Sequence, residues 1–280
     1  MRLLVSLSAV LCLLMGVRPG VSVGQNPPTS TQRLHPWGCF APGAWKLVHV
    51  VTETLDQDGA VQSTTTTETK TTLEALDDDG VALLIQGIVE MAGKRLEAEP
   101  RCVQQSFRGQ RAGAGAKVKD LGTANLTIQG REIACRVEQV EETAAAARTV
   151  TKIYFSDTVA PHVLKRESVT TDPEGRKRLN ETTVTVVAVD LPWRVLAEIK
   201  STALVHAVCR HAKGMTETWA ITSSDVPGGV IQHASKELAE NGRLVRRSTL
   251  ELVDYGREPD TKRNGLFRRL RSNRPRKPRP

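Results

Sequence analysis

The chain has 280 residues, of which 39% are apolar, 25% charged and 4% aromatic. This is the composition of an ordinary globular protein, and the scarcity of rings requires a core built from Val, Leu, Ile, Ala and the methyl groups of Thr. The net charge of +8 is concentrated in residues 262–279, which carry nine Lys or Arg and no acid. Residues 1–261 therefore sum to about −1, which excludes a globular part that is itself strongly basic.

The amino terminus has the three-part plan of a secretory signal. Arg2 is followed by an apolar run from Leu3 to Val17, which is too short for a comfortable membrane span, and then by small residues. Ser22 and Gly24 fit the small residues required before a cleavage site at Gln25. We therefore predict that residues 1–24 are a signal peptide and that the protein is exported to the periplasm, the cell envelope or the extracellular space.

Export changes the interpretation of the cysteines. An even number in an oxidising compartment indicates two disulfides, for which three connectivities are open. The pairs Cys39–Cys102 and Cys135–Cys209 would bracket the first structural unit and link the next two.

Two stretches of the chain nearly repeat each other. Residues 149–176 read TVTKIYFSDTVAPHVLKRESVTTDPEGR, and residues 216–243 read TETWAITSSDVPGGVIQHASKELAENGR. Both contain short alternating runs rich in β-branched and aromatic residues, which are typical of half-buried strands. Turn residues then follow, with Gly175 and Gly242 able to adopt positive φ. Each copy is therefore predicted to form antiparallel hairpins.

A fainter third copy starts at Trp45, and the period of 60 to 70 residues predicts three β-meander units. The expected fold is all-β with minor α, forming a curved sheet or half-barrel, because each unit needs a second layer over its apolar face. Short helical turns are expected at VEETAAAART and LPWRVLAEIKS. The predicted organisation is an N-terminal linker (25–44), unit 1 (45–107), a loop (108–120), unit 2 (121–192), unit 3 (193–257) and a basic tail (258–280).

Three stretches carry a resemblance to known proteins: HPWGCFAPGAWKLVHVVTETLD, TKIYFSDTVAPHVLKRESVTT and the segment from Thr222 to Gly256. With them the chain resembles uncharacterised exported proteins of planctomycete-type bacteria, a group that implies no activity. The order of a strand ending in Ser-Asp, a Val-Pro loop and a hairpin is also similar to the periplasmic lipoprotein carriers of the LolA type. That second resemblance implies a half-barrel that holds acyl chains.

Enzyme motifs are absent from the sequence: there is no G-x-S-x-G, H-E-x-x-H, C-x-x-C or P-loop pattern. The alternative of a hydrolase depends on Asp157 and His162 in one loop and Asp225 in its sister loop. We expect no cofactor and no metal. The best metal candidate is the pair Cys209 and His211, which share one face of a strand while His206 faces the other way.

The basic tail is the feature that most directly suggests a partner. Leu266, Phe267 and Leu270 fall near one side of a short helix among arginines, before an extended Pro-rich end. Such a segment suits an anionic membrane or envelope surface, although a solvated tail is the alternative, and nucleic acid is not an expected partner. The contact residues would be Arg268, Arg269, Arg271, Arg274, Arg276, Lys277 and Arg279.

Together these features predict an exported non-enzymatic β protein that binds an apolar or amphipathic, lipid-like ligand or serves a structural role in the envelope. The alternatives are the secreted hydrolase and a surface adhesion module that uses the tail and a threonine-rich strand face. On that face, Thr65, Thr67, Thr69 and Thr71 alternate along one strand.

Overall fold

A computed structural model describes residues 29–109, 116–144 and 146–258. These residues form a single antiparallel sheet of thirteen strands, preceded by a short 3-10 turn, η1 (Gln32–Leu34). The all-β prediction is confirmed. The strands are β1 (Trp45–Leu55), β2 (Val61–Leu76), β3 (Gly80–Met91), β4 (Lys94–Ser106), β5 (Lys117–Ile128), β6 (Arg131–Ala144), β7 (Ala147–Phe155), β8 (Val163–Thr171), β9 (Arg178–Val195), β10 (Glu198–His211), β11 (Gly214–Thr222), β12 (Val230–Ala239) and β13 (Leu244–Gly256).

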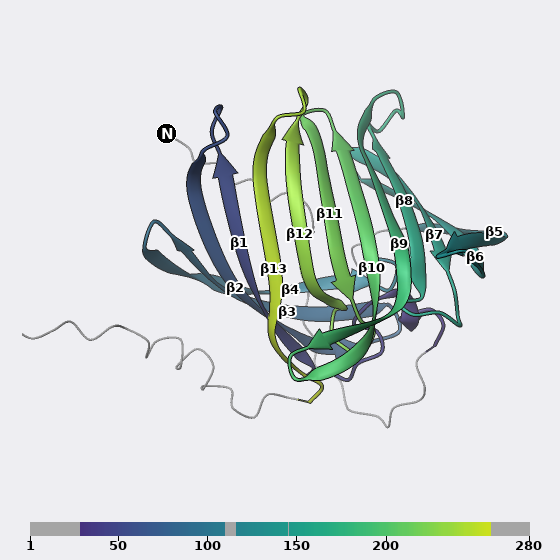
Figure 1. Cartoon of the computed structure of the whole chain (residues 1–280). Coiled ribbons are helices and arrows are strands. Elements are labelled where there is room, and N and C mark those ends of the chain that lie inside the picture. Colours follow the sequence, from purple (N-terminus) through teal and green to yellow (C-terminus); the bar gives the residue numbers. More distant parts are fainter. Residues whose placement is uncertain (1–28, 110–115, 145, 259–280) are drawn as a thin grey trace, which may run out of the picture.

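The first and last strands of the sheet lie side by side. The spatial order is β4-β3-β2-β1-β13-β12-β11-β10-β9-β8-β7-β6-β5, so the predicted first unit borders the third unit rather than the second. The chain passes from one edge strand, β4, to the other, β5. Figure 1 shows β1 and β10 to β13 as the central part of the curve, with β2 to β4 as one wing and β5 to β8 as the other.

The repeat seen in the sequence is present as matching hairpins. The first copy supplies β7 and β8 and leads into β9, and the second supplies β11 and β12 and leads into β13. Gly175 and Gly242, at the turns that follow β8 and β12, have φ values of 74° and 79°. These positive values explain why glycine stands there.

The two short helical turns expected from the sequence are not formed. Residues 140–144 and 147–149 belong to β6 and β7, and residues 191–195 and 198–201 belong to β9 and β10. Cross-strand pairing thus overrides the helix propensity of Ala and Leu in these segments.

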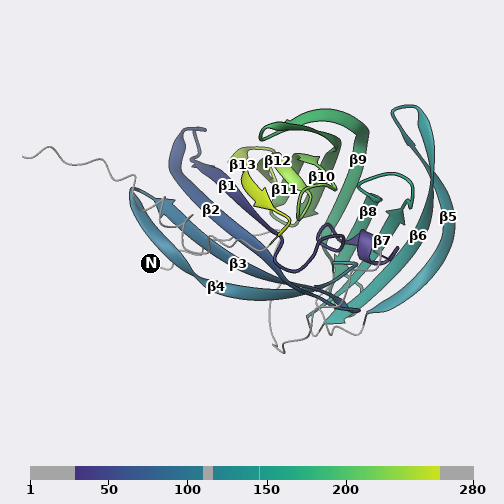
Figure 2. The same ribbon diagram turned by 90° about the horizontal axis from the view of Figure 1, so that it is seen from below.

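The segment before β1 fills the inside of the curve, as the view from below shows (Figure 2). Leu34 packs against Val140, Ile153 and Phe155 of the second wing. Trp37, Phe40 and Ala44 pack against a cluster that contains Leu73, Val81 and Leu83 of the first wing. Residues 29–44, expected to be a linker, are therefore a structural element that bridges both wings, and we call them the N-terminal plug.

All four described cysteines are free thiols, so the predicted disulfides are not formed. Cys102 pairs with Leu84 across β3 and β4, while its neighbour Val103 pairs with the buried Leu83 on the plug side of the sheet. Cys102 therefore faces away from Cys39, which belongs to the plug. Cys135 and Cys209 lie on β6 and β10, with β7, β8 and β9 between them in the sheet, whereas a disulfide requires Cα atoms within about 7 Å.

Some of the predicted segments lie outside the described residues. These are the signal peptide, most of the basic tail with its seven predicted contact residues, and part of the loop between units 1 and 2. Within residues 29–258, apart from the gaps at 110–115 and 145, no helix has the length and apolar character of a membrane span.

The plug makes a testable contribution to stability. Leu34 is 5% exposed and packs on three apolar residues of the second wing, so Leu34→Ala should lower the free energy of unfolding by about 2 to 4 kcal/mol. The same substitution at Leu96, which is 62% exposed, should change it by about 0.5 kcal/mol or less. Chemical denaturation measures both values, and equal effects would contradict the bridging role.

Candidate functional site

One candidate binding surface is the inner face of the curved sheet. Paired residues on adjacent strands share a face, so the register defines continuous rows across the sheet. One such row includes Val184 of β9, Arg166 of β8 and Ile153 of β7. Because Ile153 packs against Leu34 of the plug, this row lies on the inner face of the sheet. From β2 to β9 this row contains Thr65, Thr52, Ser248, Ser235, Thr218, Ala207 and Val184.

A second inner row lies next to the first and is also free of formal charge. It contains Thr67, Val50, Leu250, His233, Ala220, Val205 and Val186. Burial, and then the charge of Lys46, lower the pKa of His233, which favours its neutral form. Apart from the buried Val186, the members of the two rows are half-buried, so small uncharged side chains there remain partly accessible to solvent.

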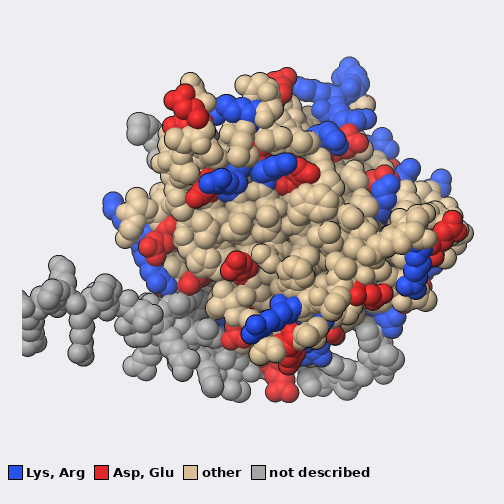
Figure 3. All heavy atoms as spheres, in the orientation of Figure 1, with Lys and Arg blue, Asp and Glu red and all other residues tan. Residues whose placement is uncertain are grey.

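The outer face is built differently. Its corresponding row contains Glu53, Arg247, Lys236 and Glu217, joined by the ion pairs Glu53–Arg247 and Glu217–Lys236. His206 also binds Glu217 and stacks on the exposed Trp219, with ring centroids 4.1 Å apart. Figure 3 shows this side of the molecule, where charged side chains gather toward the upper and lower ends around an uncharged central area.

The two sister loops at the ends of β7 and β11 share one hydrogen-bond pattern. The N–H groups of Ser156 and Ser223 donate to His162 and Gly229, six residues later in each loop. The hydroxyl oxygens of the two serines accept from the N–H groups of Thr158 and Asp225. Asp225 therefore corresponds to Thr158 rather than to Asp157.

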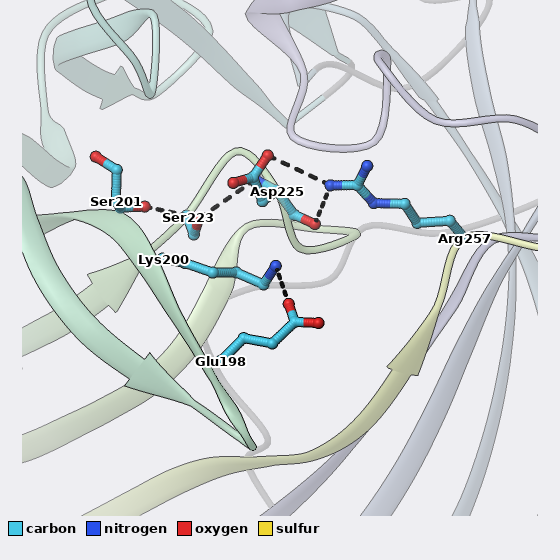
Figure 4. A network of polar contacts seen from close by, with 6 residues as sticks. All are labelled: Glu198, Lys200, Ser201, Ser223, Asp225 and Arg257. Carbon is cyan, nitrogen blue, oxygen red and sulfur yellow. Dashed lines mark hydrogen bonds and ion pairs between the residues drawn. The ribbon is translucent and has the colours of Figure 1, made fainter.

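The structure places the hydrolase candidates in separate interactions. Asp157 forms an ion pair with Arg136 at 3.3 Å, and Nδ1 of His162 lies 3.0 Å from the carbonyl oxygen of Ser156. Asp225 binds Arg257 through its carbonyl and carboxylate oxygens (Figure 4). No hydrogen bond or ion pair joins Asp157, His162 and Asp225 to one another in the described part of the chain.

His162 occupies a strained position in this loop. Its φ is 67°, close to the 72° of Gly229 at the equivalent position. The ring bond to Ser156 and a tilted contact with Phe155, at 5.9 Å between centroids, accompany this conformation. Both contacts are structural in kind, because they fix the loop to its own strand.

The residues of the metal candidate do not converge on one point either. Cys209 and His211 share a face of β10, as expected, but Nδ1 of His211 accepts a hydrogen bond from the N–H of Lys213. His206 is on the outer face with Trp219. In the described ranges no three His, Cys, Asp or Glu side chains are grouped so as to hold a metal ion.

Sequence reasoning missed Lys46, which lies between β1 and the plug. Its Nζ donates to the carbonyl oxygen of Gly228 at 3.2 Å and lies 5.8 Å from the centre of the Trp37 ring. Burial lowers the pKa of Lys46 to about 8. A desolvated amine of this kind can hold an anionic group. A lysine within a β-branched strand gives no sequence signal of this environment.

His35 of the plug is a buried histidine in its neutral form. Its Nδ1 accepts from the N–H of Trp37, so Nε2 carries the proton and donates to Oε1 of Gln105. Burial lowers the pKa of His35 to about 4, with Gln105 opposing the shift and Arg166 adding to it. The interaction with Gln105 at the end of β4 also ties the plug to the first wing.

Comparisons with known proteins give weak likenesses. No family model and no curated protein matches the chain. A predicted exported protein with a YmcC-like fold from Bacteroides fragilis matches 77% of this chain and 97% of its own, at 10% identity and a TM-score of 0.32. A predicted lipoprotein from Parabacteroides distasonis has the same coverage and identity with a TM-score of 0.27.

MucB, in a complex with MucA(peri), matches 80% of this chain and 90% of its own, at 10% identity and a TM-score of 0.16. At these TM-scores the likenesses establish neither a family nor a function. The resemblances to planctomycete proteins and to lipoprotein carriers therefore stay predictions.

The environment of His35 predicts a pH-dependent stability. Its folded pKa of about 4 lies below the ordinary 6.5, so between these values the unfolded chain binds more protons and stability rises with pH. The His35 contribution is complete above pH 6.5 and is lost as the pH falls through about 4. Denaturation between pH 5 and 7 should show a shallower slope of stability against pH for His35→Gln than for the wild-type chain; equal slopes would contradict this.

Proposed function

We propose that the protein is exported and acts without catalysis, holding an apolar or amphipathic, lipid-like ligand against the inner face of its curved sheet. One observation carries the proposal. Two neighbouring rows of uncharged side chains, most of them small, cross the sheet from β2 to β9 and, apart from Val186, remain half-buried although they face inward. Partly accessible apolar surface on a concave side is the usual setting of a ligand site.

The two inner rows differ in charge from the outer row that contains Glu53 and Glu217. The outer row next to the same backbone is laced by ion pairs, which suits contact with water. On the inner face, the members of the two rows are Thr, Ser, Ala and Val, with Leu250 and His233 as the larger exceptions. The threonines at positions 65 and 67 of the threonine-rich strand lie in these inner rows, which favours a ligand surface over an external adhesive face.

Lys46 supports the amphipathic form of the ligand. It precedes Val50 and Thr52 on β1, on the same face of the strand. Its pKa of about 8 leaves it mostly protonated at neutral pH. Within the described residues, its Nζ donates a hydrogen bond to the carbonyl oxygen of Gly228. An anionic head group would add a charge-assisted hydrogen bond there.

The ligand site is tested with the neutral dye N-phenyl-1-naphthylamine, whose fluorescence rises in apolar surroundings. The mature chain, residues 25–280, should bind the dye saturably. Ala207→Glu places a charge in the inner row and should weaken binding at least about tenfold, since a carboxylate is poorly solvated beside an apolar ligand.

The matched control is Ala234→Glu, which places the same charge on the outer face opposite Trp219. It should leave dye binding unchanged. Circular dichroism verifies that both variants are folded. Absence of saturable binding by the wild-type chain, or equal effects of the two substitutions, would show that the inner face is not the ligand site.

Export is tested by sequencing the amino terminus of protein recovered from the envelope or medium of an expressing bacterium. The signal pattern predicts Gln25 as the first residue and complete retention in the cell when residues 1–24 are deleted. Recovery of the uncleaved chain in the cytoplasm would contradict export.

A further inference from the structure

The outer face of the sheet carries an exposed indole whose orientation is fixed. Trp219 of β11 is 42% exposed and stacks on His206, its cross-strand neighbour on β10, with 4.1 Å between the ring centroids and 17° between the ring planes. Hydrogen bonds from Lys236 and then His206 hold the pKa of Glu217 below its usual range. The carboxylate of Glu217 accepts a hydrogen bond from Nε2 of His206 at 2.9 Å, so the imidazole and the indole stacked on it are held in place.

One face of this indole remains open. The stack covers the face that is turned toward β10, so the opposite face is turned toward β12. There the cross-strand neighbour of Trp219 is Ala234, which is exposed. Because alanine projects only a methyl group from the sheet, most of the indole face stands clear above it.

Small side chains continue from Ala234 across the next two strands. The row passes to Thr249 of β13 and then to Val51 of β1. Thr249 is exposed and Val51 is half-buried. We call Trp219, Ala234, Thr249 and Val51 the outer strip. It is a low, uncharged surface with an aromatic ring standing at one end, and it crosses strands that Figure 1 shows side by side in the central part of the curve.

Polar side chains border the outer strip on both sides. The border on one side consists of two ion pairs, Glu217–Lys236 and Glu53–Arg247. The border on the other side is the next outer row, with Gln232, Glu251 and His49. Both borders therefore offer hydrogen-bond donors as well as acceptors, and the opposite charges nearly cancel.

We propose that the outer strip binds a neutral saccharide chain whose rings carry equatorial substituents. Such a ring presents C–H groups on its faces and hydroxyl or amide groups around its rim. The C–H face suits the open face of the Trp219 indole, while the rim groups suit the donors and acceptors of the two borders. Balanced charges give no general attraction for a polyanion or a polycation. The proposal concerns the outer face and does not depend on a ligand at the inner face.

The test is isothermal titration calorimetry of the mature chain, residues 25–280, with chitotetraose. The wild-type chain should bind this saccharide saturably. Trp219→Ala should weaken binding about tenfold or more, because the stacking surface is removed. The matched control is Trp193→Ala, which removes an indole of similar exposure, 40%, from the β9–β10 hairpin and should leave the affinity unchanged.

A second pair of variants separates binding from cross-strand pairing, because a Trp–His pair stabilises a sheet by itself. Ala234→Leu keeps this pair and places a branched side chain against the open face of the indole. It should weaken binding about tenfold and leave the unfolding midpoint nearly unchanged. Thr185→Leu places the same side chain on the other side of the stack, where Thr185 of β9 neighbours His206, and should not change the affinity.

Three results would overturn the proposal. The first is the absence of saturable binding of chitotetraose by the wild-type chain, and the second is wild-type affinity in Ala234→Leu. The third is a wild-type dimer that Ala234→Leu dissociates without any saccharide binding, which would make the outer strip a contact between two copies of the chain. Ala207→Glu, on the inner face, should retain full affinity for chitotetraose, which keeps this result separate from dye binding.

Discussion

An antiparallel sheet can bury an apolar face only against a second layer, and this chain has no helices in its described part to provide one. The sheet meets the requirement by curving and by enclosing the N-terminal plug. Leu34 lies against β6 and β7, while Trp37 and Phe40 lie against the first wing. The plug, residues 29–44, therefore contacts strands that are far apart in the sheet. The pairing of β1 with β13 makes this possible, because it joins both wings into one continuous surface.

The plug covers only part of the inner face, and that partial coverage separates two kinds of surface. Near the plug, Ile153 and Leu73 are fully enclosed and behave as an ordinary core. Further along the same strands the inner residues become small, uncharged and half-exposed. Lys46 and His35 stand at the boundary, where desolvation lowers the pKa of both groups. The inner surface is thus closed and buried near the plug, and open and uncharged further from it.

Local sequence was sufficient to predict the strands, their turns and the repeat. The β-branched alternation and the turn glycines are short-range signals, and Gly175 and Gly242 occupy the turns for the expected reason. Pairing partners are not encoded locally, so the contact between β1 and β13 could not be foreseen. The role of the plug was missed because Leu34, His35 and Trp37 show no periodic pattern. The cysteine prediction followed from compartment alone, whereas the facing of Cys102 depends on register.

In the candidate sites, too, local features were predictable from the sequence and long-range contacts were not. The shared face of Cys209 and His211 follows from strand geometry and was predictable, whereas the environment of Lys46 depends on a contact with Gly228, 182 residues away in sequence. The segment of residues 191–201, where β9 turns into β10, was expected to be helical because Leu196 and Ala197 favour helix and no turn glycine is present. An exposed leucine at positive φ becomes visible only with the backbone conformation.

The edge strands of the sheet, β4 and β5, are the places where a further strand could pair with it. Unpaired strands attract other strands, and that tendency would seal the curve or link molecules into polymers. Each edge is interrupted: the β3–β4 register shifts where β4 carries Pro100, and the β5–β6 register shifts beside Gly122, whose φ is 84°. Arg101 follows Pro100 on β4, and Lys119 lies three residues before Gly122 on β5. Irregular pairing of this kind makes an edge a poorer template for a further strand.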